Sequence, residues 1–141
     1  MIVLVEPRTP GNIGAVARAM KNFGLEEMRL VNPCKITEEA WARAMHAQDI
    51  LESAKTYTKL NDALKDVDFV AGTSAITTPS EKEYLRLSLT PQEFAEKAKA
   101  VDGRIALLFG REDFGLYNEE LMLCDFLIRI PTVGYLSLIH I

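Results

Sequence analysis

Short apolar runs alternate with amphipathic segments along most of the chain, and this alternation is the feature that most narrows the possible folds. A near-continuous apolar run, with no polar alternation, is typical of a strand that is buried on both faces of a parallel sheet. The pattern therefore predicts an α/β fold, a largely parallel sheet of at least five strands flanked by helices. The predicted strands are residues 2–5, 28–31, 69–71, 105–109 and 126–130.

Two of the segments between these strands have clear helical patterns. Residues 12–23 place apolar side chains at helical spacing, end before Gly24 and leave Arg18 on a polar face. Thr90 precedes Pro91 and Glu93 and predicts a capped helix that runs to about residue 101. Two further short helices are predicted, with Asn61 and Asn118 as their N-caps. Residues 37–54 are also predicted to be helical, with a break near residues 46–48.

Length and charge limit the classes of protein to which the chain can belong. It has 141 residues, 48% of them hydrophobic, which fits a single domain over residues 1–141. Its formal net charge of -4 argues against a protein that coats DNA, so any binding to nucleic acid has to come from a local basic patch or from an oligomer seam. No apolar run approaches the ~18 residues of a membrane span, and a cytoplasmic protein that does not bind membranes is expected.

Three loops that each follow a predicted strand carry the residues best suited to chemistry. They span residues 6–14, 109–116 and 130–138. Loops at the carboxyl ends of parallel strands are where α/β proteins place ligands, so the three loops predict one pocket. Residues 72–89 follow another strand and are a site candidate by position alone, with a mobile surface loop as the alternative. Glycines in the first loop favour an anion such as phosphate at the start of the helix, and a plain strand-to-helix turn is the alternative.

A charged triplet, residues 111–113, lies between two glycines of the second loop. Such a triplet cannot be buried without partners. Glu112 is therefore predicted either to accept hydrogen bonds from nearby backbone amides or to hold a basic side chain.

Several enzyme classes are disfavoured because their sequence patterns are missing. The chain has no GxGxxG and no GxxxxGK[ST], which argues against dinucleotide and P-loop nucleotide sites. It also has no HExxH, nucleophile elbow or CxxC and only two histidines, so no metal site and no histidine-dependent hydrolysis are predicted. Cys34 and Cys124 lie far apart and are expected to be reduced thiols.

The three loops, taken in order, resemble the motifs of the SpoU class of SPOUT RNA methyltransferases, and most closely those of its TrmJ-like tRNA 2′-O-methyltransferases. The matching stretches are residues 6–20, 108–116 and 130–138. The resemblance implies transfer of a methyl group from S-adenosyl-L-methionine to a ribose 2′-hydroxyl of RNA. It places tRNA, at the anticodon loop, ahead of rRNA. It also implies a homodimer and a SPOUT-type fold with a trefoil knot.

Carried over by position, the resemblance assigns a role to each matching residue. Arg18 is the predicted catalytic residue, and because arginine is a poor base it is expected to bind phosphate or to polarise the hydroxyl. The predicted RNA-binding residues are Arg8, Asn12, Arg18 and Arg111. The predicted cofactor-binding residues are Thr73, Ser74, Ala75, Gly110, Glu112, Ile130, Ser137 and Leu138. A basic patch is expected from Arg8, Arg18, Lys21, Lys82, Arg86 and Arg111.

The chain departs from the family at its end. The family continues Ser-Leu-Asn and enters a helix, whereas this chain continues from Leu138 to Ile139 and stops at Ile141. A chain truncated within the third motif, with an incomplete knot and no C-terminal helix, is therefore expected. Two alternatives to the methyltransferase stay open: an inactive SPOUT-fold protein that binds RNA or cofactor, and a Rossmann-like phosphometabolite enzyme.

Overall fold

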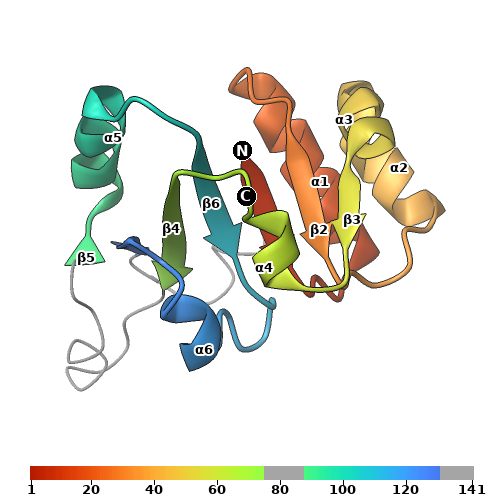
Figure 1. Cartoon of the computed structure of the whole chain (residues 1–141). Helices are drawn as coiled ribbons and strands as arrows, with labels where there is room; N and C mark the ends of the chain where they lie inside the picture. The colour runs from red at the N-terminus through yellow and green to blue at the C-terminus, as the bar shows by residue number, and fades with distance from the viewer. Residues whose placement is uncertain (75–87, 131–141) are drawn as a thin grey trace.

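A single parallel sheet organises the chain. The computed structural model describes residues 1–74 and 88–130, in which seven strands pair in the order β3-β2-β1-β6-β4-β7-β5 (Figure 1). All six strand pairs are parallel, which confirms the predicted fold class. The carboxyl ends of the strands consequently meet at one edge of the sheet, called here the carboxyl edge. The strands are β1 Ile2–Val5, β2 Met28–Val31, β3 Lys55–Tyr57, β4 Phe69–Ser74, β5 Ser88–Leu89, β6 Ile105–Phe109 and β7 Phe126–Arg129.

Five of these strands correspond to the predicted ones, and two were not predicted. β3 lies at the edge of the sheet with Lys55 and Thr56 exposed, so no apolar run marks it. β5 has only two residues. β4 extends beyond the predicted residues 69–71, so Thr73 and Ser74 belong to the end of a strand and not to a loop.

Helices connect the strands and differ from the predictions mainly at their ends. α1 begins at Pro10, two residues before the predicted start, because the proline occupies the first turn after Thr9. The predicted break near residues 46–48 is confirmed, since Met45 has φ 51° and ends one helix. The elements are α1 Pro10–Asn22, α2 Glu38–Ala44, the 3-10 helix η1 Met45–Ala47, α3 Gln48–Ser53, α4 Leu60–Ala63, α5 Pro91–Ala100 and α6 Asn118–Leu121.

The predicted helix caps were right for α5 and wrong for α4 and α6. Thr90 Oγ1 accepts a hydrogen bond from the Glu93 amide at 3.1 Å, and Glu93 Oε1 accepts one from the Thr90 amide at 3.2 Å. Asn61 is not an N-cap, because Leu60 packs against the core and takes the first helical position. Asn118 likewise lies inside the first turn of α6.

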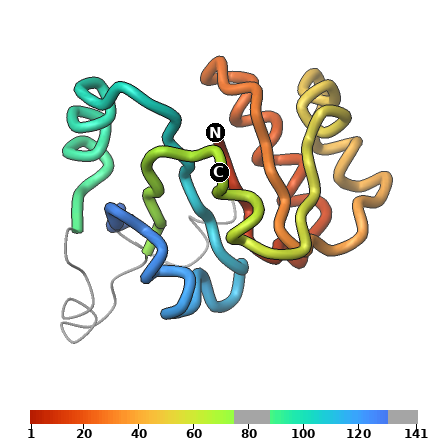
Figure 2. Tube along the Cα trace, in the orientation of Figure 1, coloured from red at the N-terminus to blue at the C-terminus, as the bar shows by residue number. Residues whose placement is uncertain are grey.

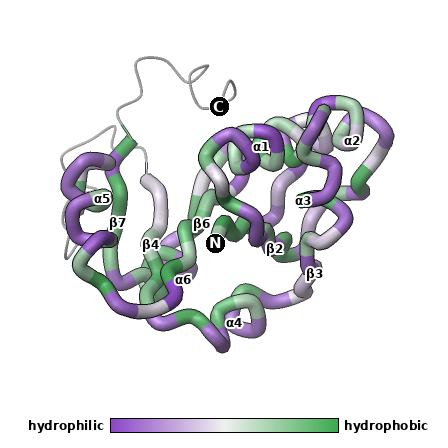
Figure 3. Tube along the Cα trace, turned by 90° about the horizontal axis from the view of Figure 1, so that it is seen from above, coloured by the Kyte–Doolittle hydropathy of each residue, from purple (hydrophilic) through white to green (hydrophobic). Residues whose placement is uncertain are grey.

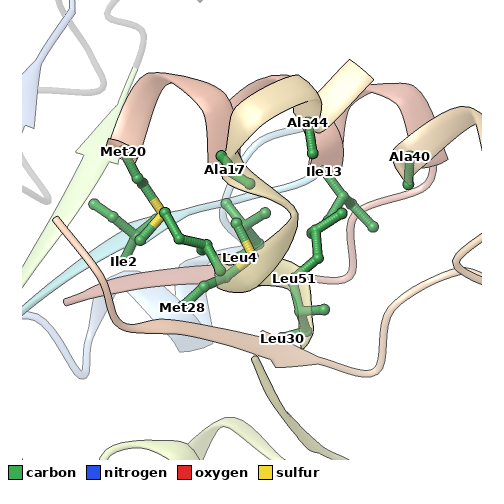
Figure 4. Close-up of a cluster of buried hydrophobic side chains, with 12 residues drawn as sticks. Ile2, Leu4, Ile13, Ala17, Met20, Met28, Leu30, Ala40, Ala44 and Leu51 are labelled. Atoms are coloured by element: carbon green, nitrogen blue, oxygen red, sulfur yellow. The ribbon is translucent and has the colours of Figure 1, made fainter. Parts of the chain in front are cut away.

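Helices cover both faces of the sheet, and β1 contributes to the core on each side. Ile2 and Leu4 pack against residues of α1, α2 and α3 (Figure 4). Val3 and Val5 belong to a second cluster, which includes residues of α4 and α6. Seen from above, α1 and α2 lie on one side of the strands and α4 lies on the other (Figure 3). Burial on both faces explains why β1 reads as a continuous apolar run.

Gly11 and Gly14 of α1 both face α2, but only one of them is needed for the close approach of the two helices. A Cβ at Gly14 would lie 2.1 Å from the carbonyl oxygen of Ala40, which is part of the α2 backbone. A Cβ at Gly11 would instead meet the ends of the Glu39 and Arg43 side chains, the nearest atom at 2.7 Å. The α1–α2 contact therefore depends on a glycine at position 14.

The amino edge of the sheet, opposite the carboxyl edge, is held by an ion-pair network. Arg29 is almost fully buried, and its guanidinium pairs with Glu27 at 2.8 Å and with Asp66. Arg104 lies at the surface and pairs with Glu27 at 2.9 Å. These contacts satisfy a charge that strand β2 would otherwise bury without a partner.

Two predictions remain, one about the trefoil knot and one about membrane-spanning helices. The predicted incomplete knot falls on residues 131–141, outside the described residues. Within residues 1–74 and 88–130, no helix has the length and apolar character needed to cross a membrane.

Candidate functional site

The site is built where two loops meet at the carboxyl edge. β1 and β6 are neighbours in the sheet, with Leu4 in register with Phe109, and their Cα traces run side by side in Figure 2. The β1–α1 loop (residues 6–9) and the β6–α6 loop (residues 110–117) therefore leave the sheet together. Side chains of each loop bind the other, although about a hundred residues separate them in the sequence.

Glu112 of the β6–α6 loop accepts hydrogen bonds from the backbone of the β1–α1 loop. Its carboxylate oxygens lie 3.0 and 3.1 Å from the Arg8 amide nitrogen and 2.7 Å from the Thr9 amide nitrogen. Asn12 Nδ2 donates to the same carboxylate over a long 3.5 Å. Of the two predicted roles of Glu112, accepting from nearby backbone amides or holding a basic side chain, the structure shows the first. Its predicted contact with the cofactor stays a prediction.

The electrostatics of Glu112 agree with this geometry. Burial acts to raise the pKa of the carboxyl, but hydrogen bonds from the Arg8 and Thr9 amides outweigh it. The pKa of Glu112 consequently lies below its ordinary value, and the group is ionised at neutral pH. A charged acceptor holds amide donors more strongly than a neutral one.

Arg111 is buried, contrary to its predicted contact with RNA. Its side chain is 1% exposed, and its guanidinium pairs with Glu6 of the β1–α1 loop and with Glu120 of α6 at 2.9 Å. The Tyr117 ring centre lies 3.6 Å from the guanidinium carbon. Turning this group outward would leave two carboxylates without their cation, so the structure gives Arg111 the role of joining the two loops.

Arg8 is an exposed cation of the β1–α1 loop. Its Nη1 atom lies 2.9 Å from Asp113 Oδ2, and both side chains are about half exposed. Its guanidinium carbon also lies 6.0 Å from the centre of the Phe114 ring. Arg8 is therefore placed where an RNA phosphate can reach it, and its RNA contact stays a prediction.

Asn12 and Arg18 share α1 but lie at different distances from the loops. Asn12 is in the first turn and reaches Glu112. Arg18 is exposed and lies six residues later, about 9 Å along the helix axis. Arg18 makes no ion pair with any residue that the structure describes. The structure thus brings Asn12 to the joined loops and leaves Arg18 on the helix surface.

The predicted cofactor residues that the structure describes lie on neighbouring strands. β4 is hydrogen-bonded to both β6 and β7, so Thr73, Ser74 and Ile130 are brought to the same part of the carboxyl edge. Thr73 Oγ1 donates to the Leu108 carbonyl at 2.9 Å, and the Ile130 amide donates to the Ser74 carbonyl at 3.0 Å. Ala75, Ser137 and Leu138, with Lys82 and Arg86 of the predicted basic patch, fall outside the described residues.

Gly110 is required by its own loop. A Cβ at this position would lie 2.1 Å from the carbonyl carbon of Gly115 and 2.3 Å from the Leu116 amide nitrogen. The β6–α6 loop folds back on itself here, with Arg111 and Gly115 exchanging backbone hydrogen bonds. A contact of Gly110 with a cofactor stays a prediction.

Sequence reasoning missed the two carboxylates that hold Arg111. Glu120 has a local signal, because it lies three residues after Tyr117 and its carboxylate accepts from the Tyr117 amide at 2.7 Å. Glu6 has no local signal, since its partner is 105 positions away. Among the described residues, no group of three or more histidine, cysteine or acidic side chains is arranged to hold a metal ion.

Comparisons with known proteins agree with this geometry. A tRNA (cytidine-2′-O-)-methyltransferase TrmJ of Methanocaldococcus jannaschii is 45% identical over 132 residues, which are 93% of this chain and 57% of that protein. The structure of a probable methylase family protein from Haemophilus influenzae superposes with a TM-score of 0.86 at 36% identity, over 99% of this chain and 60% of that one. TrmJ from Z. mobilis gives 0.86 at 28% identity, over 99% of this chain and 64% of that one.

The chain spans about half the length of the curated relatives that it matches. The model of the SpoU rRNA methylase family matches residues 1–138, which is nearly the whole sequence. With the motif loops joined at the carboxyl edge of a parallel sheet, the chain belongs to the SpoU rRNA methylase family.

Proposed function

We propose that the chain transfers a methyl group from S-adenosyl-L-methionine to a ribose 2′-hydroxyl of tRNA, with the anticodon loop as the target region. The observation that carries the proposal is the joining of the β1–α1 and β6–α6 loops by Glu112 and Arg111. This arrangement holds the first turn of α1, with Asn12, against the carboxyl edge. The 45% identity to a tRNA 2′-O-methyltransferase supports tRNA as the substrate.

The residues at the ends of β4, β6 and β7 fit the cofactor. Thr73, Ser74, Gly110 and Ile130 supply a small, uncharged surface of hydroxyl, backbone and aliphatic groups, which suits an adenosine moiety. These residues would hold S-adenosyl-L-methionine, which supplies an electrophilic methyl group when bound. They also form the part of the carboxyl edge beside the joined loops.

The protein's own groups then have to anchor and orient the ribose. Arg8 is exposed at the joined loops and is proposed to bind a phosphate. Arg18 is proposed to bind a second phosphate or to polarise the hydroxyl, because a guanidinium does not release its proton at neutral pH. Methyl transfer also needs an in-line approach of the hydroxyl oxygen, and a rigid β1–α1 loop favours this geometry.

The direct test is methyl transfer by the purified chain. We expect radiolabel from S-adenosyl-L-methionine to enter transcribed tRNA, and mass spectrometry of the digested RNA to show a 2′-O-methylated nucleoside. A 2′-deoxy nucleotide at the modified position should abolish labelling. Labelling of rRNA fragments alone would contradict the tRNA assignment.

Binding measurements separate the alternative functions. Isothermal titration that shows cofactor binding without any transfer would favour an inactive cofactor-binding protein. Binding of a nucleotide with no response to RNA would favour a phosphometabolite enzyme. A homodimer is also proposed from the family resemblance, and sedimentation equilibrium of the same preparation tests it.

Arg18→Ala tests the catalytic assignment. We expect it to reduce methyl transfer by at least tenfold. Cofactor affinity should stay unchanged, because the Arg18 side chain is exposed and is not part of the described core. Lys55→Ala is the control, since Lys55 is an exposed cation of edge strand β3 and makes no ion pair with any residue that the structure describes. Full turnover by Arg18→Ala would remove Arg18 from the reaction.

A further inference from the structure

One of the two joined loops carries an exposed aromatic ring to which the proposed methyl transfer assigns no role. Phe114 is 70% exposed, although a phenylalanine side chain is usually buried. It lies in the β6–α6 loop, two residues after Glu112, which binds the backbone of Arg8 and Thr9. The loop is thereby held in place while the ring projects from it into solvent.

The surroundings of the ring are charged. The Arg8 guanidinium carbon lies 6.0 Å from the ring centre, and Arg8 Nη1 pairs with Asp113 at 2.9 Å. Both partners of that ion pair are about half exposed, and an exposed pair of this kind contributes little to stability. A phosphate can therefore replace Asp113 as the partner of Arg8 at little cost.

An aromatic face next to an exchangeable arginine matches the chemistry of a nucleotide, which carries a flat base and a phosphate. Proteins that bind single-stranded RNA stack unpaired bases on exposed aromatic rings and pair the backbone with cations. We infer that Phe114 stacks on an unpaired base of the RNA substrate while Arg8 binds a phosphate of the same strand. Phe114 is then a positioning residue, and the inference rests on the proposed function.

Steady-state kinetics test the energetic contribution of the ring. Phe114→Ala should raise KM for tRNA about tenfold, the loss expected for one stacked base, with a smaller change in kcat and unchanged cofactor affinity. Phe114→Trp should restore KM, because any aromatic face can stack. Phe23→Ala is the matched control: Phe23 is 81% exposed and lies just beyond the far end of α1.

A tryptophan reporter tests the contact itself, independently of turnover. Trp41 is the only tryptophan of the chain, so Trp41→Phe combined with Phe114→Trp places a single indole at the ring position. We expect tRNA to quench its fluorescence, and to leave the emission of Trp41→Phe combined with Phe23→Trp unchanged.

Three results would overturn the inference: an unchanged KM in Phe114→Ala, equal quenching at positions 23 and 114, or dissociation of a dimer by Phe114→Ala in sedimentation. The last result would mean that the ring packs against a second copy of the chain. Failure of the unsubstituted chain to methylate any RNA would contradict the proposed function, whereas the quenching experiment reports on stacking alone.

Discussion

Glu112 is the side chain on which the geometry of the site most depends. Glu112→Gln keeps the shape but replaces a charged acceptor of two amides by a neutral one. We expect a loss of about 1 kcal/mol in the free energy of unfolding, because one carboxylate oxygen becomes an NH2 group that cannot accept a hydrogen bond and the other loses its charge. Methyl transfer should fall by at least tenfold, because the β1–α1 loop is held less firmly. Urea denaturation and kcat/KM measure the two effects. Glu119→Gln is the control, since Glu119 is an exposed glutamate of α6.

The same carboxylate gives a pH dependence with a definite sign. The pKa of Glu112 is lower in the folded protein than its ordinary value, so the folded state binds fewer protons than the unfolded state near that value. Its contribution to stability is therefore present above the ordinary pKa, about 4.3, and is lost as the pH falls through the lower folded value. Unfolding free energies measured between pH 7 and pH 3 should fall less steeply for Glu112→Gln. Parallel curves would contradict this prediction.

Neighbouring residues show what sequence can and cannot assign. A charged triplet between glycines has to find partners, so Glu112 was predicted to bind either backbone amides or a basic side chain, and the structure shows the amides. Arg111 was predicted to bind RNA and is instead buried between Glu6 and Glu120. Arg111 and Glu112 are adjacent in the sequence, and the sequence does not show which of the two turns inward. Arg111 does so because Glu6 lies beside it, and Glu6 is brought there only by the pairing of β1 with β6.

The packing of α1 against α2 gives two glycine substitutions with opposite expected effects. Helix propensity alone predicts that either Gly11→Ala or Gly14→Ala stabilises the protein by about 1 kcal/mol. At position 14 the new Cβ would lie 2.1 Å from the α2 backbone, so we expect a net loss of about 1–3 kcal/mol. At position 11 it meets only the ends of two flexible side chains, and a neutral or stabilising change is expected.

Thermal unfolding of the two variants measures this difference. Stabilisation by both substitutions would show that α1 and α2 are not in close contact. Destabilisation by both would show that the Glu39 and Arg43 side chains cannot move aside. The result matters for the site because α1 carries Asn12 and Arg18.

The elements were predictable to the extent that burial marks them. β1, β2 and β6 are covered on both faces and appear as apolar runs, whereas β3 exposes Lys55 and Thr56 and gives no such signal. The capping box at Thr90 was predictable because its two hydrogen bonds join residues three apart. The site loops were predicted to share one pocket, but direct contact between the β1–α1 and β6–α6 loops depends on the order of the strands, which local sequence does not encode.

Fewer exposed cations are available for RNA binding than the predicted basic patch implied. The net charge is -4, Arg111 is buried, and Lys21 lies in the last turn of α1, away from the joined loops. Among the predicted patch residues that the structure describes, Arg8 and Arg18 are the exposed arginines. Binding of tRNA therefore has to rely on few phosphate contacts of this part of the chain.

A small number of phosphate contacts predicts a moderate dependence on salt. Each neutralised phosphate contributes a slope of about -0.7 to -0.9 to the logarithm of the binding constant against that of the salt concentration, so two contacts predict about a tenfold loss of affinity between 50 and 200 mM salt. Arg8→Ala should reduce the slope by about one contact. Lys65→Ala, an exposed lysine outside the site, should leave it unchanged. A flat response would show that phosphates do not hold the RNA here. A slope several times steeper would mean that cations beyond Arg8 and Arg18 contribute.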